Sequence, residues 1–426
     1  MSSSSVGSSN LPNRWVIAIA AFCMQLALGA VYTWSVFLTP VIKLYHVERA
    51  PANATFSIVL LALGITAGFG GYLNNRFGPR AIATASGILY GLGVFLAGFV
   101  APNLFLLYLT YGIIGGIGIG LGYIVALAML IKWFPDRRGF ITGLAVAGFG
   151  GGAAITGPVA ANLLLPTFGL SSTFIILGIC YLLIVVVAAQ FYHRAPEGYA
   201  PAGWAPPVTE RNVRSVRDYT LREALSSPRW YVLWLILALN VTAGAALISV
   251  AAPLAVNFTH VTLAVASALV ITISIFNGAG RLFWGWLSDA IGRPYAFLSM
   301  FIIQIFAFAL TPFIGSFALL FIPASLIGLC YGGGFGTMPA FAADFFGPKN
   351  AGTIYGVMLT AWSAGGIIGP ILITSFGTTA RPDYVTPLYI IAVIMVVSCA
   401  LPFVARILER RQIEQETIQV TAGPGR

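Results

Sequence analysis

The sequence predicts an all-α integral membrane protein whose twelve transmembrane helices form two pseudo-symmetric six-helix halves. Hydrophobic residues make up 58% of its 426 residues and charged residues only 8%, whereas charged residues are about a quarter of an ordinary soluble domain. A helix that crosses a bilayer needs about 20 predominantly apolar residues. Twelve stretches meet this requirement, namely 15–39, 54–73, 81–101, 104–131, 139–166, 171–193, 229–253, 261–287, 295–314, 317–343, 350–376 and 385–407.

The positive charges predict how these helices are oriented. If the loops are assigned alternately to the two sides of the membrane, eighteen of the 22 Lys and Arg residues fall on the side of the N-terminus. Only Lys43, Arg49 and Arg381 fall on the other side, and Arg281 lies within a predicted helix. The positive-inside rule then places both termini in the cytoplasm of a multi-pass plasma membrane protein, a bacterial inner membrane protein in our interpretation. The net charge of +10 is therefore a topology signal, and no nucleic-acid partner is expected.

The long polar stretch 194–228 predicts a cytoplasmic linker between the two halves. It carries six Pro or Gly residues before Glu210 and a run of arginines after it. Within it, Asp218–Trp230 is expected to form a short amphipathic helix on the inner membrane surface. The resulting division is a disordered cytoplasmic tail (1–13), an N-terminal half (14–193), the linker (194–228), a C-terminal half (229–408) and a cytoplasmic tail (409–426).

Two motifs occur once in each half. GYLNNRFGPR (71–80) corresponds to GWLSDAIGRP (285–294), 214 positions later, and WFPDRRGFITGLAVAG (133–148) corresponds to FFGPKNAGTIYGVMLTAW (345–362), about 213 positions later. Parallel six-helix repeats joined by a central linker are typical of the major facilitator fold, whose substrate site lies near the membrane midplane between the halves.

The first repeated motif also predicts a gate. An acidic residue in this loop can cap a helix or pair with the arginine that follows, and so hold one conformation closed. Asp289 with Arg293 fits this role in the second half. In the first half the acidic position is Asn75, followed by Arg76 and Arg80. Asparagine can cap a helix but cannot form an ion pair, so we expect the gate of the first half to be held more loosely.

Arg281 is the strongest functional signal, because it is the only charge between residues 261 and 286. A charge in hydrocarbon costs about 3 kcal/mol on insertion scales, and no acidic residue lies in any hydrophobic stretch to offset it. A substrate anion can supply the missing partner. Arginine binds a carboxylate through two parallel hydrogen bonds, and Asn277, one turn earlier, shares its helix face. The alternative is that Arg281 snorkels, since it lies only about 12 Å above the following loop at 1.5 Å per residue.

Several large side chains are candidates for the same cavity. Leu28 and Tyr32, Tyr331 and Phe335, and Leu359 and Trp362 are pairs at helical spacing. Tyr123 ends the glycine-rich run GIIGGIGIGLGY, and Phe149 follows another glycine. Plain packing is the alternative for each of them.

Three segments resemble the oxalate/formate antiporter family and the related monocarboxylate transporters. These are NRWVIAIAAFCMQLALGAVYTWSVF, KWFPDRRGFITGLAVAGFGGG and NGAGRLFWGWLSDAIGR, and the similarity runs from Asn13 to about Arg406. The resemblance implies that Arg281 binds the substrate carboxylate. It also implies that Asn277 stands where monocarboxylate transporters have an aspartate. The aromatic box of the oxalate exchanger maps onto Tyr32, Tyr123, Tyr331, Phe335 and Leu359.

One departure from that family bears on the substrate. Oxalate exchangers carry a lysine that neutralises a second carboxylate, and Trp362 stands at the aligned position here. A dianion would leave one charge uncompensated, and a unit charge pair at 4 Å is worth about 4 kcal/mol at an effective dielectric of 20. The sequence therefore favours a monocarboxylate such as lactate, pyruvate or formate. The apolar Leu28, Phe149 and Trp362 suit a small organic tail better than bare formate.

The mode of coupling is less constrained by the sequence. No carboxyl group lies in the middle of a predicted helix, and the three histidines lie near helix ends. We expect a co-transported proton, with His260 as one candidate carrier because histidine titrates near neutral pH. A tyrosine or a water that travels with the anion is another. Exchange of carboxylates, of the oxalate:formate type, is the alternative mode of transport.

Other classes of function are less consistent with the sequence. It has no phosphate-binding loop, no HExxH motif and no nucleophile–base pair, so neither an enzyme nor a cofactor or metal is expected. An anion channel is an alternative that the twofold repeat disfavours. A drug–proton antiporter is another alternative, but AITGPVAANL (154–163) lacks the closing glycines expected of one.

Overall fold

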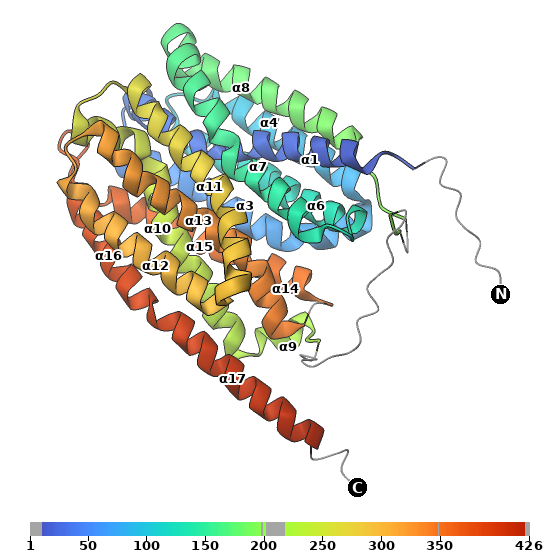
Figure 1. Ribbon diagram of the computed structural model, residues 1–426. Helices are drawn as coiled ribbons and strands as arrows, with labels where there is room; N and C mark the ends of the chain where they lie inside the picture. The colour runs from blue at the N-terminus through green and yellow to red at the C-terminus, as the bar shows by residue number, and fades with distance from the viewer. Residues whose placement is uncertain (1–10, 197–198, 202–217, 348, 422–426) are drawn as a thin grey trace.

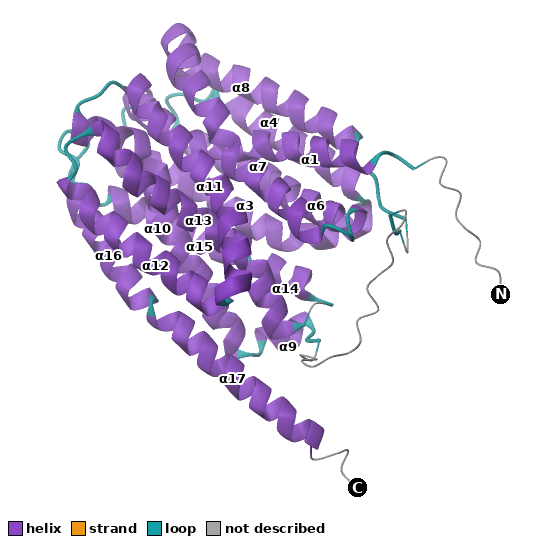
Figure 2. Ribbon diagram, viewed as in Figure 1, coloured by secondary structure: helices purple, strands orange, loops and turns teal. Residues whose placement is uncertain are grey.

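The computed structural model is nearly all helical over the residues it describes, 11–196, 199–201, 218–347 and 349–421 (Figure 2). Eleven of its segments are long and apolar enough to cross a membrane, and one of these has 48 residues, Gly143–Gln190. That segment leaves the helical conformation at Gly169, where φ is 71°, a value that glycine adopts without steric cost. Two helices meet at this residue, so the segment contains two spans and the predicted twelve spans are present in the described part.

Each half contains six of these spans. The spans of the N-terminal half are formed by α1 (Arg14–Gly29), η2 (Ala30–Thr33) and α2 (Trp34–Tyr45); α3 (Arg49–Phe77); α4 (Pro79–Ala97); α5 (Leu104–Leu107), η3 (Tyr108–Gly115) and α6 (Gly116–Trp133); α7 (Arg138–Val159) and η4 (Ala160–Leu164); and α8 (Leu165–Gln190). Those of the C-terminal half are α10 (Pro228–Thr259); α11 (Leu263–Ile291); α12 (Arg293–Leu310) and η5 (Thr311–Phe313); α13 (Phe317–Phe346); α14 (Ala351–Met358) and α15 (Thr360–Thr374); and α16 (Val385–Ser398) and α17 (Ala400–Thr421).

Small residues bring the two halves into backbone contact at two places. Gly150 of α7 faces Gly278 of α11 so closely that a Cβ on Gly150 would lie 2.7 Å from the Gly278 nitrogen. Gly64 of α3 faces Ser363 of α15 in the same way, and the Ser363 hydroxyl donates to the Leu61 carbonyl at 2.9 Å. In membranes, where helices gain little from hydrophobic burial, such close packing is a main source of helix association.

The start of α1 and the end of α17 lie on the same side of the bundle (Figure 1), which we call the terminal face. The ion pairs that the described residues form there lie within each half. Arg14 binds Asp136 through two hydrogen bonds of 2.6 and 3.1 Å, and these bonds hold the pKa of Asp136 below its ordinary value. In the C-terminal half, Arg293 pairs with Asp289 and Asp344.

The polar contacts on the opposite side, the far face, join the two halves instead. Glu48 accepts hydrogen bonds from the backbone and the hydroxyl of Thr379. Arg49 donates to the Phe376 carbonyl at 2.7 Å and lies over the ring of Tyr384, 4.6 Å from its centroid. The sequence predicts Arg49 in an outer loop, but it is the first residue of α3 and only 5% exposed.

Deeper in the far side of the bundle, Asn53 extends this connection. Its amide nitrogen donates to the Ser249 hydroxyl and the Pro370 carbonyl, both at 3.1 Å, and its oxygen accepts from Trp34. The far face is thus closed by hydrogen bonds between the halves, whereas the described ion pairs of the terminal face lie within each half and do not tie the halves together.

The region between the halves agrees only in part with the sequence prediction. Within the predicted linker, residues 197–198 and 202–217 lie outside the described part, as does 1–10 of the predicted tail. The predicted amphipathic helix is a single short element, α9 (Leu221–Leu225), which begins with a capping box formed by Thr220 and Glu223. In the predicted C-terminal tail, α17 continues as far as Thr421.

Removing the Arg49 side chain should open the far face. Arg49→Ala deletes the bond to Phe376 and the contact with Tyr384, together about 2 kcal/mol, which changes the ratio of open to closed molecules roughly thirtyfold. Spin labels at Leu44 and Val385, in a background with the native cysteines replaced by serine, should report a longer distance. Lys43→Ala removes an exposed charge of the same region as the control, and an unchanged Leu44–Val385 distance in Arg49→Ala would contradict this role.

Candidate anion-binding site

Arg281 lies in the interior of the bundle, on α11, with only 2% of its surface exposed. Its Nε donates to the Asn277 side-chain oxygen at 3.3 Å, and its Nη1 lies 3.5 Å from the Tyr123 hydroxyl. The guanidinium carbon is 5.0 Å from the ring centroid of Phe335 and 5.6 Å from that of Phe149. None of the ion pairs among the described residues involves Arg281. The charge is therefore held by dipoles and aromatic faces alone.

Three buried donors around this guanidinium have no hydrogen-bond partner. They are Nη2 of Arg281, Nδ2 of Asn277 and the hydroxyl of Tyr355. The Tyr355 hydroxyl lies near Arg281 and near the Tyr123 hydroxyl. A buried donor left without a partner costs about 1–3 kcal/mol. A ligand with two acceptor oxygens, such as a carboxylate, can satisfy them.

Aromatic rings from both halves enclose the region. From the N-terminal half, Tyr123 and Tyr32 meet Phe149 edge to face, with centroids 5.1 and 5.5 Å apart. From the C-terminal half, Trp362 packs against Tyr123 at 5.2 Å and against Phe335 at 4.5 Å. These rings exclude water around Arg281 and present apolar surface to the remainder of a bound molecule.

A hydrogen-bond chain crosses between the halves within this aromatic cluster. The Trp362 indole nitrogen donates to the Tyr331 hydroxyl at 3.0 Å, and that hydroxyl is 3.1 Å from the hydroxyl of Tyr32. Because Tyr331 accepts from Trp362, its own hydrogen is free to point to Tyr32. Tyr32 belongs to the N-terminal half and Tyr331 to the other, so the halves cannot separate here without breaking this bond.

The ten residues that the sequence nominates for the site are all buried, each 2% exposed or less. Eight of them form the cluster described above. Leu28 packs on Gly122, next to Tyr123. Leu359 lies at the break between α14 and α15. Its carbonyl oxygen contacts Gly64 of α3. The structure brings the eight together and leaves Leu28 and Leu359 at the edge.

The site is closed in this structure. A cavity of about 10 Å³ lies beside Asn277, lined also by Tyr32, Ser274 and apolar residues of α10 and α11. That is room for about one water molecule. Any ligand larger than a water molecule needs the surrounding helices to move apart.

Two residues that line or support the site are not among the sequence candidates. Ser274 accepts from the Ala154 backbone at 3.1 Å and donates to the Gly150 carbonyl at 2.7 Å, which ties α7 to α11. Its spacing to Asn277 and Arg281 is three and seven residues, the pattern of one helix face. Tyr355 is seven residues before Trp362, a spacing that also indicates a shared face.

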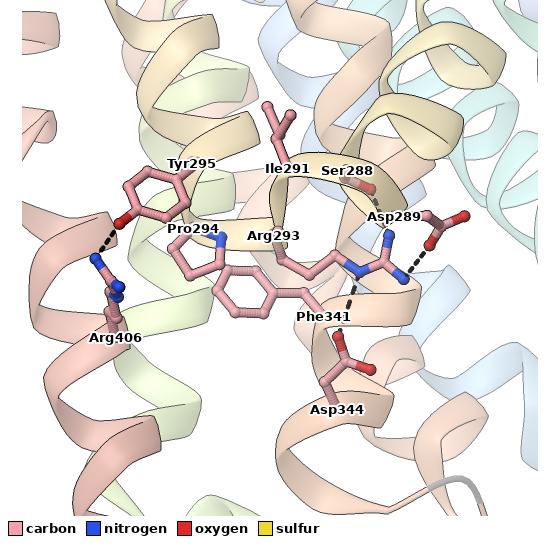
Figure 3. A pocket seen from close by; sticks show the side chains of 10 residues that line it. Ser288, Asp289, Ile291, Arg293, Pro294, Tyr295, Phe341, Asp344 and Arg406 are labelled. Atoms are coloured by element: carbon pink, nitrogen blue, oxygen red, sulfur yellow. Dashed lines mark hydrogen bonds and ion pairs between the residues drawn. The ribbon is translucent and has the colours of Figure 1, made fainter.

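The gating motif of the second half forms the predicted ion pair (Figure 3). Arg293 pairs with Asp289, and its Nε also lies 3.2 Å from Asp344 of α13. Ser288 accepts from the same guanidinium. The loop between α11 and α12 is thereby tied to the end of α13.

The corresponding loop of the first half has different contacts. The backbone carbonyl of Asn75 accepts from Arg194 at 3.0 Å, Arg80 lies 2.8 Å from the ring nitrogen of His193, and Arg76 lies over a neighbouring ring. None of the described ion pairs involves Arg76 or Arg80, in line with the amide at position 75.

His260 is distant from the central residues. It is the exposed C-cap of α10, in the left-handed conformation with φ 56°. The next helix, α11, carries Arg281 eighteen residues after its start, about 27 Å along the axis. In the described part of the chain, His, Cys, Asp and Glu do not gather in groups of three or more that could hold a metal ion.

Several known proteins are similar to this chain over most of its length. A transporter of Escherichia coli, the uncharacterized MFS-type transporter YhjX, is 32% identical over 83% of this chain and 86% of its own length. The oxalate:formate antiporter of Oxalobacter formigenes is 29% identical over 86% and 87%. Apicoplast pyruvate carrier 1 of Toxoplasma gondii is 26% identical over 80% of each chain.

A solved structure shares the fold of this chain. The crystal structure of a bacterial homologue of the human lysosomal transporter Spinster, inward-facing and unoccupied, superimposes with a TM-score of 0.71 at 16% identity, covering 95% of this chain and 99% of that one. The family model of the Major Facilitator Superfamily matches residues 16–370 and 233–422. With its twelve spans in two halves, the chain belongs to the major facilitator superfamily of membrane transporters.

Proposed function

We propose that this protein is a secondary transporter of a small monocarboxylate anion, lactate-like or pyruvate-like, that works by alternating access with a co-transported proton. The observation that carries the proposal is a buried arginine without a carboxylate partner, whose Nη2 is unpaired beside the unpaired amide of Asn277. One carboxylate oxygen can accept from each of these groups. The Tyr355 hydroxyl is a third donor, for a carboxylate oxygen or for a 2-hydroxyl or 2-oxo group.

The charge count supports a monoanion. Arg281 is the charged residue of the cluster, and Trp362 donates its indole N–H to Tyr331 within it. A second carboxylate would meet aromatic faces, whose negative quadrupoles disfavour an anion. The names of the relatives, an oxalate:formate antiporter and a pyruvate carrier, support a small carboxylate as the substrate class.

The polar contacts support a cycle with two gates. The far-face bonds of Glu48 and Arg49 and the central Tyr32–Tyr331 bond join the halves. The terminal-face ion pairs of Arg14 and Arg293 stay within their halves. Because most Lys and Arg residues lie on the side of the N-terminus, the positive-inside rule assigns the terminal face to the cytoplasm. The terminal face is therefore the side that opens first from this closed state, and the bonds between the halves break before the far side opens.

The geometry favours a proton carried close to the substrate over one carried by His260. The exposed position of His260 places it at the far mouth rather than beside Arg281. The tyrosine hydroxyls of the central chain or a water beside the anion fit this role better. Carboxylate exchange is the second candidate, favoured by the similarity to the oxalate:formate antiporter over most of the chain.

Uptake of labelled L-lactate into proteoliposomes with an empty lumen tests the proposal. An inward proton gradient should drive accumulation, and Arg281→Lys at equal protein should reduce it at least tenfold, because an ammonium cannot reproduce the paired hydrogen bonds. Arg222→Lys, an exposed arginine before α10, is the control. Uptake that requires a second carboxylate in the lumen would show exchange, and normal uptake by Arg281→Lys would contradict the site.

Tyr355→Phe removes one donor and keeps the ring. We expect about tenfold weaker lactate binding, because hydrogen bonds to charged groups contribute about 1.5–3 kcal/mol. Tyr192→Phe is a matched control, since Tyr192 also has a buried and unpaired hydroxyl, at the end of the N-terminal half. Binding measured by calorimetry should be unchanged in Tyr192→Phe, and equal affinities in both variants would remove Tyr355 from the site.

Trp362→Lys should shift the preference toward dicarboxylates. The added ammonium can offset a second carboxylate, and a unit charge pair at 4 Å is worth about 4 kcal/mol at a dielectric of 20. Competition of oxalate and of unlabelled lactate against labelled lactate measures the preference. Trp362→Met, which removes the ring without adding charge, is the control. If oxalate, relative to unlabelled lactate, inhibits both variants equally, the number of positive charges in the site does not set the preference.

A further inference from the structure

A cavity of about 270 Å³ lies on the terminal face, where the end of α11 and the start of α12 meet α13 and α17 (Figure 3). It is separate from the central site. Arg406 and Tyr295 lie at one end, and Asp289 and Asp344 lie at the other, around Arg293. The transport cycle proposed above assigns no ligand to it.

The first end of the cavity is cationic. Arg406 of α17 lies over the ring of Tyr295, 4.8 Å from its centroid, and donates to its hydroxyl. None of the ion pairs among the described residues involves Arg406. A guanidinium has five N–H donors in a planar fork, so most of its capacity is left for an anionic group.

The second end is anionic. Asp289 and Asp344 share the single guanidinium of Arg293, which leaves one negative charge in excess. The Asp289 side chain is 66% exposed and that of Asp344 is 49% exposed, so both carboxylates have accessible lone pairs. The cavity therefore has opposite charges at its two ends.

Its surroundings place the cavity at the edge of the membrane. It lies at the ends of the spans Leu263–Ile291 and Arg293–Phe313. Exposed apolar side chains flank it, Ile291 on α11 and Phe403 and Ile407 on α17. Such side chains face acyl chains, and headgroups lie at this depth of a bilayer. Basic pockets between transmembrane helices on the cytoplasmic side are known recognition sites for lipid headgroups.

We propose that this cavity binds the headgroup of a zwitterionic aminophospholipid, with the phosphodiester on Arg406 and the primary ammonium on Asp289 and Asp344. A primary ammonium donates hydrogen bonds to carboxylates, which a quaternary ammonium cannot do. A purely anionic headgroup would meet the two carboxylates at the second end. Because the ammonium competes with Arg293 for Asp289, occupancy of the cavity changes the ion pair of the gating motif and so links lipid composition to the conformational cycle.

Thermal stability of the purified full chain in detergent tests the proposal. Dihexanoyl phosphatidylethanolamine should raise Tm saturably and at lower concentration than dihexanoyl phosphatidylcholine. Arg406→Gln should weaken the apparent affinity at least tenfold, since it removes the charged partner of the phosphodiester. Arg411→Gln, an exposed arginine of α17 outside the cavity, should leave it unchanged.

A second variant examines the other end of the cavity. Asp344→Asn should abolish the preference for ethanolamine over choline while it retains binding of both lipids. Equal shifts of Tm by the two lipids in the unaltered protein would overturn the proposal. So would stabilisation by dihexanoyl phosphatidylglycerol at equal or lower concentration, which would indicate an anionic lipid site, or by inorganic phosphate alone, which would indicate a free-anion site.

Discussion

The burial of Arg281 without a carboxylate partner is the constraint on which the rest of the structure depends. Removing a charge from water costs several kcal/mol even after the protein relaxes. Two aromatic faces and one amide oxygen offset part of that cost, since a cation over an aromatic face is worth about 2 kcal/mol when desolvated. The remaining donors are left for a ligand. The interior is thus arranged so that a bound anion would stabilise it.

Most of the fold can be predicted from the sequence, because local patterns along the chain encode it. Runs of about 20 apolar residues locate the spans, and the charges and repeats divide them into halves. Eight of the site residues could be found because helical spacing, glycine runs and family resemblance each mark a helix face. Tyr355 was missed because the predicted face rests on pairs three or four residues apart, such as Leu359 and Trp362, whereas Tyr355 lies two turns before Trp362.

Contacts between residues distant in the chain could not be predicted in this way. Arg49 looks like any outer charge until the loop that contains Phe376, 327 residues later, is placed beside it. The same holds for the pairing of Arg293 with Asp344 and for the cavity that α17 closes. Such contacts depend on how the helices pack, and each involves one or two polar atoms that leave no periodic pattern in the sequence.

The two backbone contacts between the halves, Gly150 with Gly278 and Gly64 with Ser363, have a mechanical consequence. If the two halves rock about the line that joins these two backbone contacts, displacement grows with distance from that line, as in a lever. Arg281 is three residues from Gly278, about 4.5 Å along the helix, and Trp362 is next to Ser363. The candidate anion-binding site therefore sits close to the fulcrum, and the two faces at either end of the bundle would swing most.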